Sequence, residues 1–441
     1  MSFSRREFIG SASALIAGAG LATSPVAGAV SAASRVAPSD RLNFGVIGVR
    51  GMGWSNLEGH IKIPGVTCTA LCDVDANVLS ERAAQLEQIN GRAPATYRDY
   101  REMLDDRDID FVIIATPDHW HCLQMVHACE AGKDVFVEKP LANSIAECDI
   151  MVRAAERYNR VVTVGQWQRS NTHWQDALTY VQDGHIGRVR LVKAWAYMGW
   201  MKSIPPQPDQ PAPEHVDYDM WLGPAAERPF NPNRFHFNFR WFWDYAGGLM
   251  TDWGVHLIDM ALLGMNAAEP NSVMSSGGKF AYPDDAAETP DTQQAIYEFD
   301  DFSMIWEHAV GIDNGPYGRG HGVAFIGNEG TLVVDRGGWE VIPEVEDGQY
   351  KTPAIPPRRG QRTGVDPHAE NFIECIKTRA RPNAPVDSAA NTAVVAHLGN
   401  VAFKVGRRVT WDNRARRFVN DPEADDIIRP DYRDPYTLPS V

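Results

Sequence analysis

The sequence predicts an α/β chain with two folded domains, and three observations support this prediction. At roughly 150 residues per domain, its 441 residues correspond to two or three domains. Between residues 41 and 164, short apolar runs alternate with turns and helix-compatible segments, which is the pattern of a parallel sheet. Between residues 165 and 410, closely spaced apolar strands predict an α+β domain with a largely antiparallel open sheet.

The composition excludes several classes of protein. Hydrophobic residues make up 44% and charged residues 22% of the chain, which excludes wholesale disorder. The net charge of −15 argues against nucleic-acid binding, because neutralising phosphates requires clustered cations. The six cysteines show no C-x-x-C and no zinc spacing, and neighbouring ones are too far apart to be bridged. We therefore expect buried structural thiols and no metal site.

The first 33 residues resemble an export signal. Ser4–Ile9, SRREFI, is similar to the twin-arginine signature, and an apolar Gly- and Ala-rich stretch with small-residue cleavage sites follows. That stretch is too short to predict a membrane span. We expect a periplasmic or otherwise exported protein with no stable membrane insertion after signal cleavage. A disordered or anchoring tail is the less favoured interpretation.

The first predicted strand, LNFGVIG, leads into a glycine turn. In the dinucleotide-binding turn G-x-G-x-x-G, the first glycine makes the bend, the second lets the backbone approach the pyrophosphate, and the third allows close helix packing. Gly48 and Gly53 match the first and third positions. Arg50 occupies the second, and we expect the adjacent Gly51 to provide the space, with Met52 also in the cofactor-binding loop. The turn therefore predicts an N-terminal Rossmann domain at residues 41–164.

Asp73 ends the second predicted strand, at about the spacing where an acidic residue binds the adenosine ribose. A carboxylate at this place repels the extra phosphate of NADP, and no Arg or Lys directly follows Asp73. We therefore favour NAD over NADP as the cofactor. A helix cap or turn carboxylate is the alternative interpretation of Asp73.

Two further apolar runs of this domain end in polar motifs. One run ends at Thr116 and Pro117, and another at Glu138, Lys139 and Pro140. Polar residues at the carboxyl ends of parallel strands point into the ligand crevice. We therefore count Thr116, Pro117, Glu138 and Lys139 among the cofactor-binding residues.

Three motifs together resemble the Gfo/Idh/MocA oxidoreductases: the glycine turn with CDVD, TPDHWH at 116–121, and EKP at 138–140. Downstream, GGLMTDWGVHLID at 247–259 is similar to the D-x-x-x-H motif of that family, and the resemblance covers most of residues 41–410. It implies an NAD(P)-dependent enzyme acting on CH-OH groups. Members of the family include sugar and inositol dehydrogenases, glucose–fructose oxidoreductases and NAD-dependent glycosidases.

The resemblance places Lys139 near the nicotinamide ribose and the reacting hydroxyl, with Asp252 and His256 opposite. At spacing i, i+4, Asp252 and His256 are expected to share one helical face. Oxidising an alcohol requires a base, for which His256 is suited by its ordinary pKa near 6.5, and Lys139 supplies positive charge to the developing alkoxide. The alternatives for the Asp–His pair are a structural pair or two metal ligands, but no third ligand has convincing spacing.

Other candidates rest on position alone. Trp120 of TPDHWH is a candidate to cover the cofactor, and His121 to orient the loop, while Asp118 could equally start a helix. In the segment VTVGQWQRS, Gln166 is a candidate cofactor contact and Arg169 a candidate substrate contact. For both, a surface or packing role is about as well supported.

The second domain carries a Pro- and aromatic-rich insertion at residues 200–245. Alternate positions from Phe235 to Tyr245 are all aromatic, which predicts a strand with one face on the core. This run ends shortly before Asp252, and flat aromatic surfaces with polar neighbours suit a pyranose ring. Core packing accounts for most of the run, but Trp241, Trp243 and Tyr245 are candidate substrate contacts, and we expect at least one of the two tryptophans to line a sugar pocket.

These observations predict an NAD(H)-dependent oxidoreductase acting on a hydroxyl or carbonyl of a small carbohydrate. We expect a tightly retained cofactor, because an exported enzyme has no soluble NAD pool. One alternative is an NAD-dependent glycosidase that works by transient oxidation and elimination, with no net redox. Another is a non-catalytic sugar-binding protein, which the intact Lys139, Asp252 and His256 disfavour. We expect a homo-oligomer, a dimer or tetramer, and a polar tail at residues 411–441 that wraps a neighbour.

Overall fold

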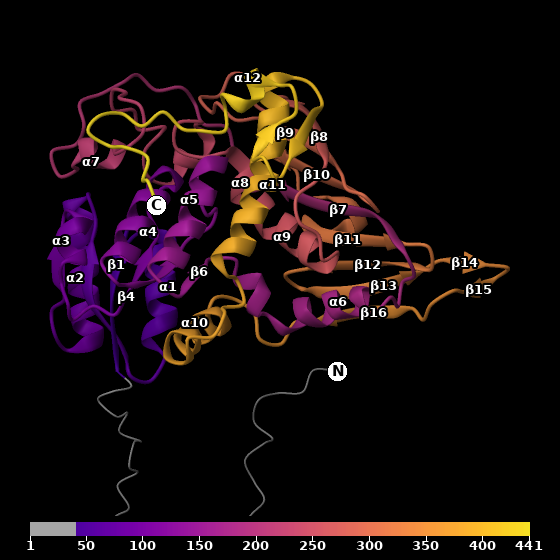
Figure 1. Cartoon of the computed structure of the whole chain (residues 1–441), viewed down its shortest axis with the longest axis horizontal. Coiled ribbons are helices and arrows are strands. Elements are labelled where there is room, and N and C mark those ends of the chain that lie inside the picture. Colours follow the sequence, from indigo (N-terminus) through magenta and orange to yellow (C-terminus); the bar gives the residue numbers. More distant parts are fainter. Residues whose placement is uncertain (1–40) are drawn as a thin grey trace, which may run out of the picture. The chain divides into compact units, whose positions relative to one another are not determined.

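Six parallel strands form the first sheet, in the order β3-β2-β1-β4-β5-β6 (Figure 1). The computed structural model describes residues 41–441, so the leader predicted at residues 1–33 lies outside the described residues. The strands are β1 (Leu42–Ile47), β2 (Val66–Cys72), β3 (Ala95–Tyr97), β4 (Phe111–Ile114), β5 (Asp134–Val137) and β6 (Val162–Val164). All pairings between them are parallel, which confirms the predicted Rossmann architecture.

Helices return the chain from the end of each strand to the start of the next. They are α1 (Gly51–Ile61), α2 (Ala76–Asn90), α3 (Tyr100–Leu104), α4 (Asp118–Glu130) and α5 (Ile145–Arg157). Asp75 caps α2 by accepting hydrogen bonds from the backbone N–H groups of Asn77 and Val78, and Ser144 caps α5. This winding brings the carboxyl ends of β1, β2, β4 and β5 to one edge of the sheet, where their terminal residues can meet a shared ligand.

The second sheet has ten strands in the order β16-β13-β12-β11-β7-β10-β9-β8-β17-β18. The strands are β7 (Val189–Met198), β8 (Ser272–Gly278), β9 (Thr292–Glu298), β10 (Ser303–Val310), β11 (His321–Gly327), β12 (Gly330–Asp335), β13 (Gly338–Pro343), β16 (Ile355–Arg359), β17 (Val409–Asp412) and β18 (Arg417–Phe418). Only the pair β7 and β10 is parallel, so the predicted, largely antiparallel sheet is confirmed. A two-stranded ribbon, β14 (Val345–Glu346) with β15 (Gln349–Tyr350), extends beyond β13 (Figure 1).

Helices of the second half of the chain contact both sheets. They are α6 (Thr172–Gln182), α9 (Gly254–Gly264), α10 (Asp366–Thr378) and α11 (Val386–Val405), and α6, α9 and α11 pack on the second sheet. Helix α11 also contacts α5 (Figure 1), and a continuous hydrophobic core joins the two sheets there. Helix α10 packs on α1 in a separate hydrophobic cluster. The six cysteines are buried within these elements and free, as expected.

The strand predicted over the aromatic run is wrong. This segment forms the 3₁₀-helix η3 (His236–Trp241), between the short helices α7 (Tyr218–Leu222) and α8 (Gly248–Asp252). Its aromatic side chains do not share one face: Phe239 and Trp241 are buried, whereas Phe237 is 52% exposed. The alternation of aromatic residues therefore does not mark a strand, because the successive rings pack in separate places outside both sheets.

The C-terminal tail folds back on its own chain. After the short helix α12 (Pro422–Asp425), the Tyr432 hydroxyl donates a 2.5 Å hydrogen bond to Glu147 of α5, and the Tyr436 ring lies 5.4 Å from Trp120 of α4. The Arg433 guanidinium donates to the carbonyl of Gly223, which follows α7. Between residues 41 and 441, no helix is long and apolar enough to cross a membrane.

Candidate active site

A cavity of about 430 Å³ opens at the carboxyl edge of the first sheet. One wall comes from the strand ends and the loops after them, and it contains ten of the predicted cofactor-binding residues: Gly48, Arg50, Gly51, Met52, Asp73, Thr116, Pro117, Trp120, Glu138 and Lys139. The opposite wall comes from α7 and η3 of the insertion: Met220, Trp221, His236, Phe237, Phe239 and Arg240. The structure thus brings together residues that lie up to about 190 positions apart in the chain.

The glycine turn has the backbone geometry that a dinucleotide requires. A Cβ atom at Gly53 would overlap the carbonyl oxygen of Gly48, so only glycine allows α1 to start this close to β1. Gly51 has φ of 37°, and a Cβ placed there would meet no atom within 4 Å. Open space next to the first turn of α1 therefore remains for a pyrophosphate, although Arg50 stands at the usual second glycine position.

Asp73 lies at the end of β2, where the turn and the insertion meet. Its carboxylate accepts hydrogen bonds from the backbone N–H groups of Val49 (2.9 Å) and Asp75 (3.0 Å). Burial raises the pKa of Asp73, and these two hydrogen bonds oppose that rise. The carboxylate therefore braces the glycine turn and also lines the cavity.

Three charged side chains meet at the far end of the cavity. The Lys139 ammonium lies 2.7 Å from Asp252 Oδ1 and also donates to the Asp252 carbonyl oxygen at 3.0 Å. Arg240 Nε donates to the same Oδ1 atom at 3.1 Å. Burial raises the pKa of Asp252, but the charges of Lys139 and Arg240 together outweigh it and lower the pKa to about 2. Asp252 is therefore a fixed anion that holds two cations beside the cavity.

His256 lies close to this charge cluster but not on the same helix as Asp252. Helix α8 ends at Asp252 and α9 begins at Gly254, so the expected continuous helical face is wrong. The His256 ring is 5% exposed, and its Nδ1 atom has no hydrogen-bond partner among residues 41–441. Burial, with the positive charges of Arg336 and Lys139, lowers its pKa well below the ordinary value. The imidazole is therefore neutral at pH 7, with a free ring nitrogen but a weakened basicity. His256 is not among the residues that line the main cavity.

Two titratable residues near this cluster were not predicted as site residues from the sequence. Asp118, the first residue of α4, lines the cavity and is 5% exposed. Burial raises its pKa to about 8, although Arg240 and Lys139 oppose the rise, so Asp118 is a neutral acid at pH 7. The guanidinium of Arg336, from the β12–β13 turn, lies 4.3 Å from the centre of the Trp253 ring, and burial lowers its pKa to about 10. The only signal for Asp118 was its place after β4, and Arg336 had none.

Trp120 and His121 follow Asp118 on α4 and differ in their placement. Trp120 lines the cavity, and its indole N–H donates to the carbonyl oxygens of Met220 (3.1 Å) and Trp221 (3.2 Å) in α7. His121 does not line the cavity. Its ring nitrogens lie 2.8 Å from the Pro140 carbonyl oxygen and 2.9 Å from that of Thr116, so it joins the two loops that follow β4 and β5.

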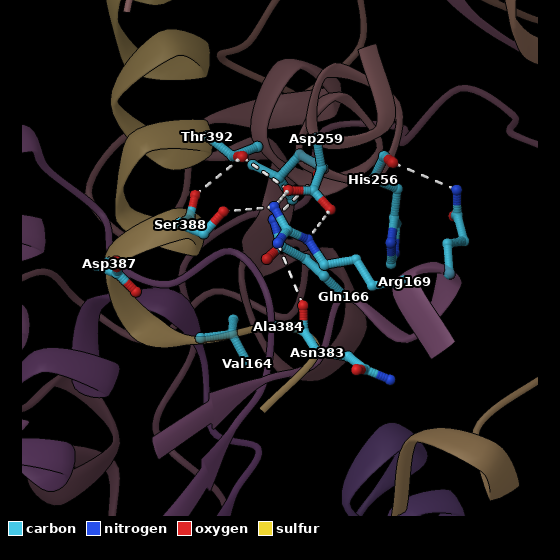
Figure 2. Close-up of polar contacts among 12 residues, drawn as sticks. Val164, Gln166, Arg169, His256, Asp259, Asn383, Ala384, Asp387, Ser388 and Thr392 are labelled. Atoms are coloured by element: carbon cyan, nitrogen blue, oxygen red, sulfur yellow. Dashed lines mark hydrogen bonds and ion pairs between the residues drawn. The ribbon is translucent and has the colours of Figure 1, made fainter. Parts of the chain in front are cut away.

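Arg169 and Gln166, predicted as substrate and cofactor contacts, do not line the cavity. Figure 2 shows Arg169 facing Asp259 of α9, with Nε and Nη2 at 2.7 and 2.6 Å from its two carboxylate oxygens. Arg169 also donates to Ser388 at the start of α11. Gln166 is buried and donates to the carbonyl of Val255, and its Oε1 atom has no partner in the described part of the chain. Both residues tie the start of the second domain to α9.

The three predicted aromatic contacts also lie outside the main cavity. Tyr245 is fully buried, with its ring 4.9 Å from Trp221. The indole N–H of Trp243 donates to the Glu288 carbonyl, and the Lys404 ammonium lies 4.1 Å from its ring centre. Trp241 lines a second, smaller cavity. The main cavity is lined instead by the aromatic side chains of Tyr100, Trp120, Trp221, Phe237 and Phe239.

Two family models match the chain, one for each sheet. Residues 42–166 match the "Oxidoreductase family, NAD-binding Rossmann fold" model of Gfo/Idh/MocA proteins, and residues 192–438 match the "C-terminal alpha/beta domain" model.

No group of three or more His, Cys, Asp or Glu side chains between residues 41 and 441 is placed to hold a metal ion.

Curated relatives match a shorter part of the chain. The "Glycosyl hydrolase family 109 protein 1" of Shewanella sp. (strain ANA-3) is 36% identical over 169 residues, which are 35% of this chain and 37% of that protein. The "Glycosyl hydrolase family 109 protein" of Shewanella putrefaciens has the same identity and coverage. The chain therefore matches little more than a third of the length of these relatives.

Solved structures share the fold over a longer range. A levoglucosan dehydrogenase in complex with NADH and levoglucosan superposes with a TM-score of 0.63 at 20% identity, covering 84% of this chain and 99% of that one. An aldose-aldose oxidoreductase from Caulobacter crescentus, complexed with glycerol, has a TM-score of 0.63 at 21% identity, covering 84% and 100%. With both sheets matched by its models, the chain belongs to the Gfo/Idh/MocA oxidoreductase family and has that family's NAD-binding Rossmann domain.

Proposed function

We propose that this protein oxidises a hydroxyl group of a sugar or glycoside with an NAD that it retains. The observation that carries the proposal is the cluster of Lys139, Asp252 and Arg240 at the end of the NAD-binding cavity, with a neutral His256 beside it. A sugar-binding protein without chemistry would have no need for three partly buried charges at this place, because removing charge from water is costly.

The residues of the cavity fit NAD. The open space at Gly51 and the first turn of α1 suit the pyrophosphate, and Asp73 at the end of β2 suits the adenosine ribose. Thr116, Glu138 and Lys139 then line the part of the cavity left for the nicotinamide half. When bound, NAD supplies the chemistry of accepting a hydride from a carbon atom that bears a hydroxyl group, and of returning it.

The side chains around this end of the cavity have distinct parts in the reaction. His256 takes the hydroxyl proton, since its ring is neutral and its Nδ1 has no partner among the described residues. Lys139 places positive charge beside the developing alkoxide, and Asp252 holds Lys139 in position. Arg240 shares Asp252 and lies over Phe237 and Phe239, at 4.6 and 4.7 Å from their ring centres. Of these two rings, Phe237 is 52% exposed and offers apolar surface to the substrate.

A carbohydrate substrate is supported by two independent observations. The wall formed by η3 combines exposed aromatic surface at Phe237 with the polar groups of His236 and Arg240, which suits a pyranose with apolar faces and polar edges. The solved structures of similar fold contain levoglucosan in one case and belong to an aldose-aldose oxidoreductase in the other.

Retention of the cofactor is supported by the way the insertion is fastened over the cavity. Just before α7, the insertion exchanges backbone hydrogen bonds with the β2–α2 loop, from Asp217 N–H to the Val74 carbonyl and from Ala76 N–H to the His215 carbonyl, both at 2.9 Å. The His236 ring lies 3.2 Å from Asp75 in the same loop. We propose that these contacts hold the insertion over the cavity and so slow the release of bound NAD.

Cofactor retention agrees with the leader predicted from Arg5 and Arg6. We propose that the protein is exported already folded around NAD and works in the periplasm, where a lost nucleotide could not be replaced. The cofactor would then be regenerated in place, by a second carbonyl substrate or by re-reduction of the same sugar. A homo-oligomer remains our prediction for the assembly.

A glycosidase is the second candidate, and two observations favour it. The curated relatives are glycosyl hydrolase family 109 proteins at 36% identity, over 35% of this chain. Asp118, a neutral acid that lines the cavity, is a proton donor suited to a departing glycosidic oxygen. Such an enzyme would oxidise the sugar transiently, eliminate the leaving group, add water and reduce the product. The first step is therefore the same for both candidates.

Variants of the two acid–base residues test the proposal. Lys139→Ala and His256→Ala should each lower turnover of a reactive sugar at least about 10²-fold while the protein still purifies with NAD. Lys62→Ala is the matched control, because Lys62 is 61% exposed and pairs only with the surface residue Asp366. If the protein reacts with a glycoside without releasing a reducing sugar from it, the result would favour the oxidoreductase over the glycosidase. Near-normal turnover in either variant would remove that residue from the mechanism.

A further inference from the structure

A second cavity of about 150 Å³ lies on the other side of η3 from the NAD cavity. Phe237 lines both cavities, so the two adjoin at this residue. Because Arg240 lies over Phe237 and binds Asp252, the junction is at the reacting end of the main cavity rather than at the adenosine end. A substrate that extends beyond the reacting ring would therefore reach the second cavity.

The mouth of this cavity carries two large exposed aromatic rings. Trp200 is 56% exposed and Phe237 is 52% exposed, and their ring centres are 6.2 Å apart with the planes inclined by 65°. Single exposed aromatic residues are common on protein surfaces. Here, however, the rings of Trp200 and Phe237 meet at the mouth of a cavity, and the buried Trp241 lines its interior. Together they form an aromatic cradle that suits the flat face of a ligand.

Polar groups surround the aromatic cradle. Asn238, Lys202, Asp285 and Thr289 line the same cavity. Aromatic faces with hydrogen-bonding groups at their edges match a pyranose ring, which presents C–H bonds on its faces and hydroxyls around its rim. Asp285 already pairs with Lys279 at 3.0 Å, and the Lys202 ammonium donates to the Gly199 carbonyl at 2.8 Å, so these charged groups are held in place at the rim of the cavity.

The cavity is built on a fixed framework. Asp291 accepts backbone hydrogen bonds from Phe280, Ala281 and Tyr282, at 2.9 to 3.0 Å, which holds the loop after β8. On the proline-rich side, Asn233 donates to the Pro205 carbonyl at 2.8 Å. Because these segments are already ordered, binding a sugar here would cost little conformational entropy.

We propose that the second cavity is a subsite for the neighbouring sugar of a glycoside, so that the substrate has at least two rings. This inference rests on the proposed function, since it names the substrate class of the same site. The reacting ring lies near Lys139 and Asp252, and the next ring stacks on Trp200 and Phe237.

The test compares binding of two-ring and one-ring sugars to the purified holoprotein by calorimetry. The probes are maltose, cellobiose, lactose and trehalose, each compared with the corresponding methyl hexosides and an aryl hexoside. At least one disaccharide should bind about tenfold or more tightly than its methyl hexoside. Trp200→Ala should remove about that factor for the disaccharide and leave the hexoside unchanged, whereas Trp200→Phe should retain most of the affinity. Tyr350→Ala is the matched control, because Tyr350 is 67% exposed on the distant β15 strand.

The two claims can fail separately. Equal binding of one-ring and two-ring sugars, an equal effect of Trp200→Ala on both, or tighter binding of the aryl hexoside than of every disaccharide would overturn the subsite. Disaccharide binding that depends on Trp200, without any change in the nicotinamide absorbance, would support the subsite and contradict the proposed redox function.

Discussion

Asp252 offers the sharpest test of the charge cluster, because one carboxylate oxygen receives both cations. The charges of Lys139 and Arg240 outweigh burial and lower the Asp252 pKa from 3.8 to about 2. One pKa unit corresponds to about 1.4 kcal/mol, so the folded protein stabilises the ionised carboxylate by about 2 kcal/mol. Asp252→Asn keeps the size of the side chain and removes this contribution. We therefore expect its free energy of unfolding at pH 7 to fall by about 2 kcal/mol.

The pH dependence gives this prediction a definite sign. A carboxylate whose pKa is lowered by folding contributes stability above the unfolded value of 3.8, and the contribution is lost as the pH falls toward 2. The difference between Asp252→Asn and the wild type should therefore shrink between about pH 4 and pH 2. Turnover should fall about 10²-fold, because Lys139 is no longer held beside the forming alkoxide. Bound NAD should remain, since Asp252 does not line the NAD cavity.

The measurements are denaturant unfolding across this pH range, turnover with a reactive sugar, and nucleotide content by mass spectrometry. The control is Asp301→Asn, because Asp301 is 82% exposed and its ion pair with Arg188 is on the surface. A surface change of this kind should alter stability by less than about 0.5 kcal/mol and leave turnover unchanged. If Asp252→Asn behaves like the control, the cluster has no part in catalysis or stability.

Three further predictions follow from buried charges elsewhere in the chain. Arg169→Met should lower the free energy of unfolding by about 3 kcal/mol or more, because it leaves the buried carboxylate of Asp259 without its cation. The Michaelis constant should not change. A raised Michaelis constant at normal stability would restore Arg169 as a substrate contact. Asp118 holds its proton below about pH 8, so the pH–rate profile should change near that pH in the wild type and lose this limb in Asp118→Asn. Asp73→Ser should narrow the preference for NAD over NADP, and equal affinity of the wild type for both nucleotides would show the assignment of Asp73 to be wrong.

The cofactor side of the cavity was predictable because it depends on local order. A strand followed by a turn places Gly48, Asp73, Thr116 and Lys139 at the carboxyl edge of a parallel sheet, whatever the rest of the chain does. Period and turn signals therefore located ten residues of that wall. The family resemblance placed Asp252 and His256 opposite Lys139, but it did not predict that Asp252 pairs with both Lys139 and Arg240.

The opposite wall was not predictable in the same way. Alternating aromatic residues indicated a strand from Phe235, yet the segment has no sheet edge to join and forms η3 instead. Nothing in the sequence around Arg169 indicated that its charge is neutralised by Asp259, which lies 90 residues away. Arg336 reaches the His256 pocket only because the β12–β13 turn folds toward it. Such contacts depend on long-range packing, which neither periodicity nor spacing encodes.

The central claim is that a retained NAD is reduced by a carbohydrate within this protein. The most direct measurement is to dialyse the purified protein extensively, identify its bound nucleotide by mass spectrometry, and follow the nicotinamide absorbance after adding aldoses or glycosides without free nucleotide. The account predicts about one NAD per chain and a change in absorbance with at least one sugar. A protein that emerges without nucleotide and acts only when NAD is added, or one whose bound nucleotide responds to no sugar, would contradict it.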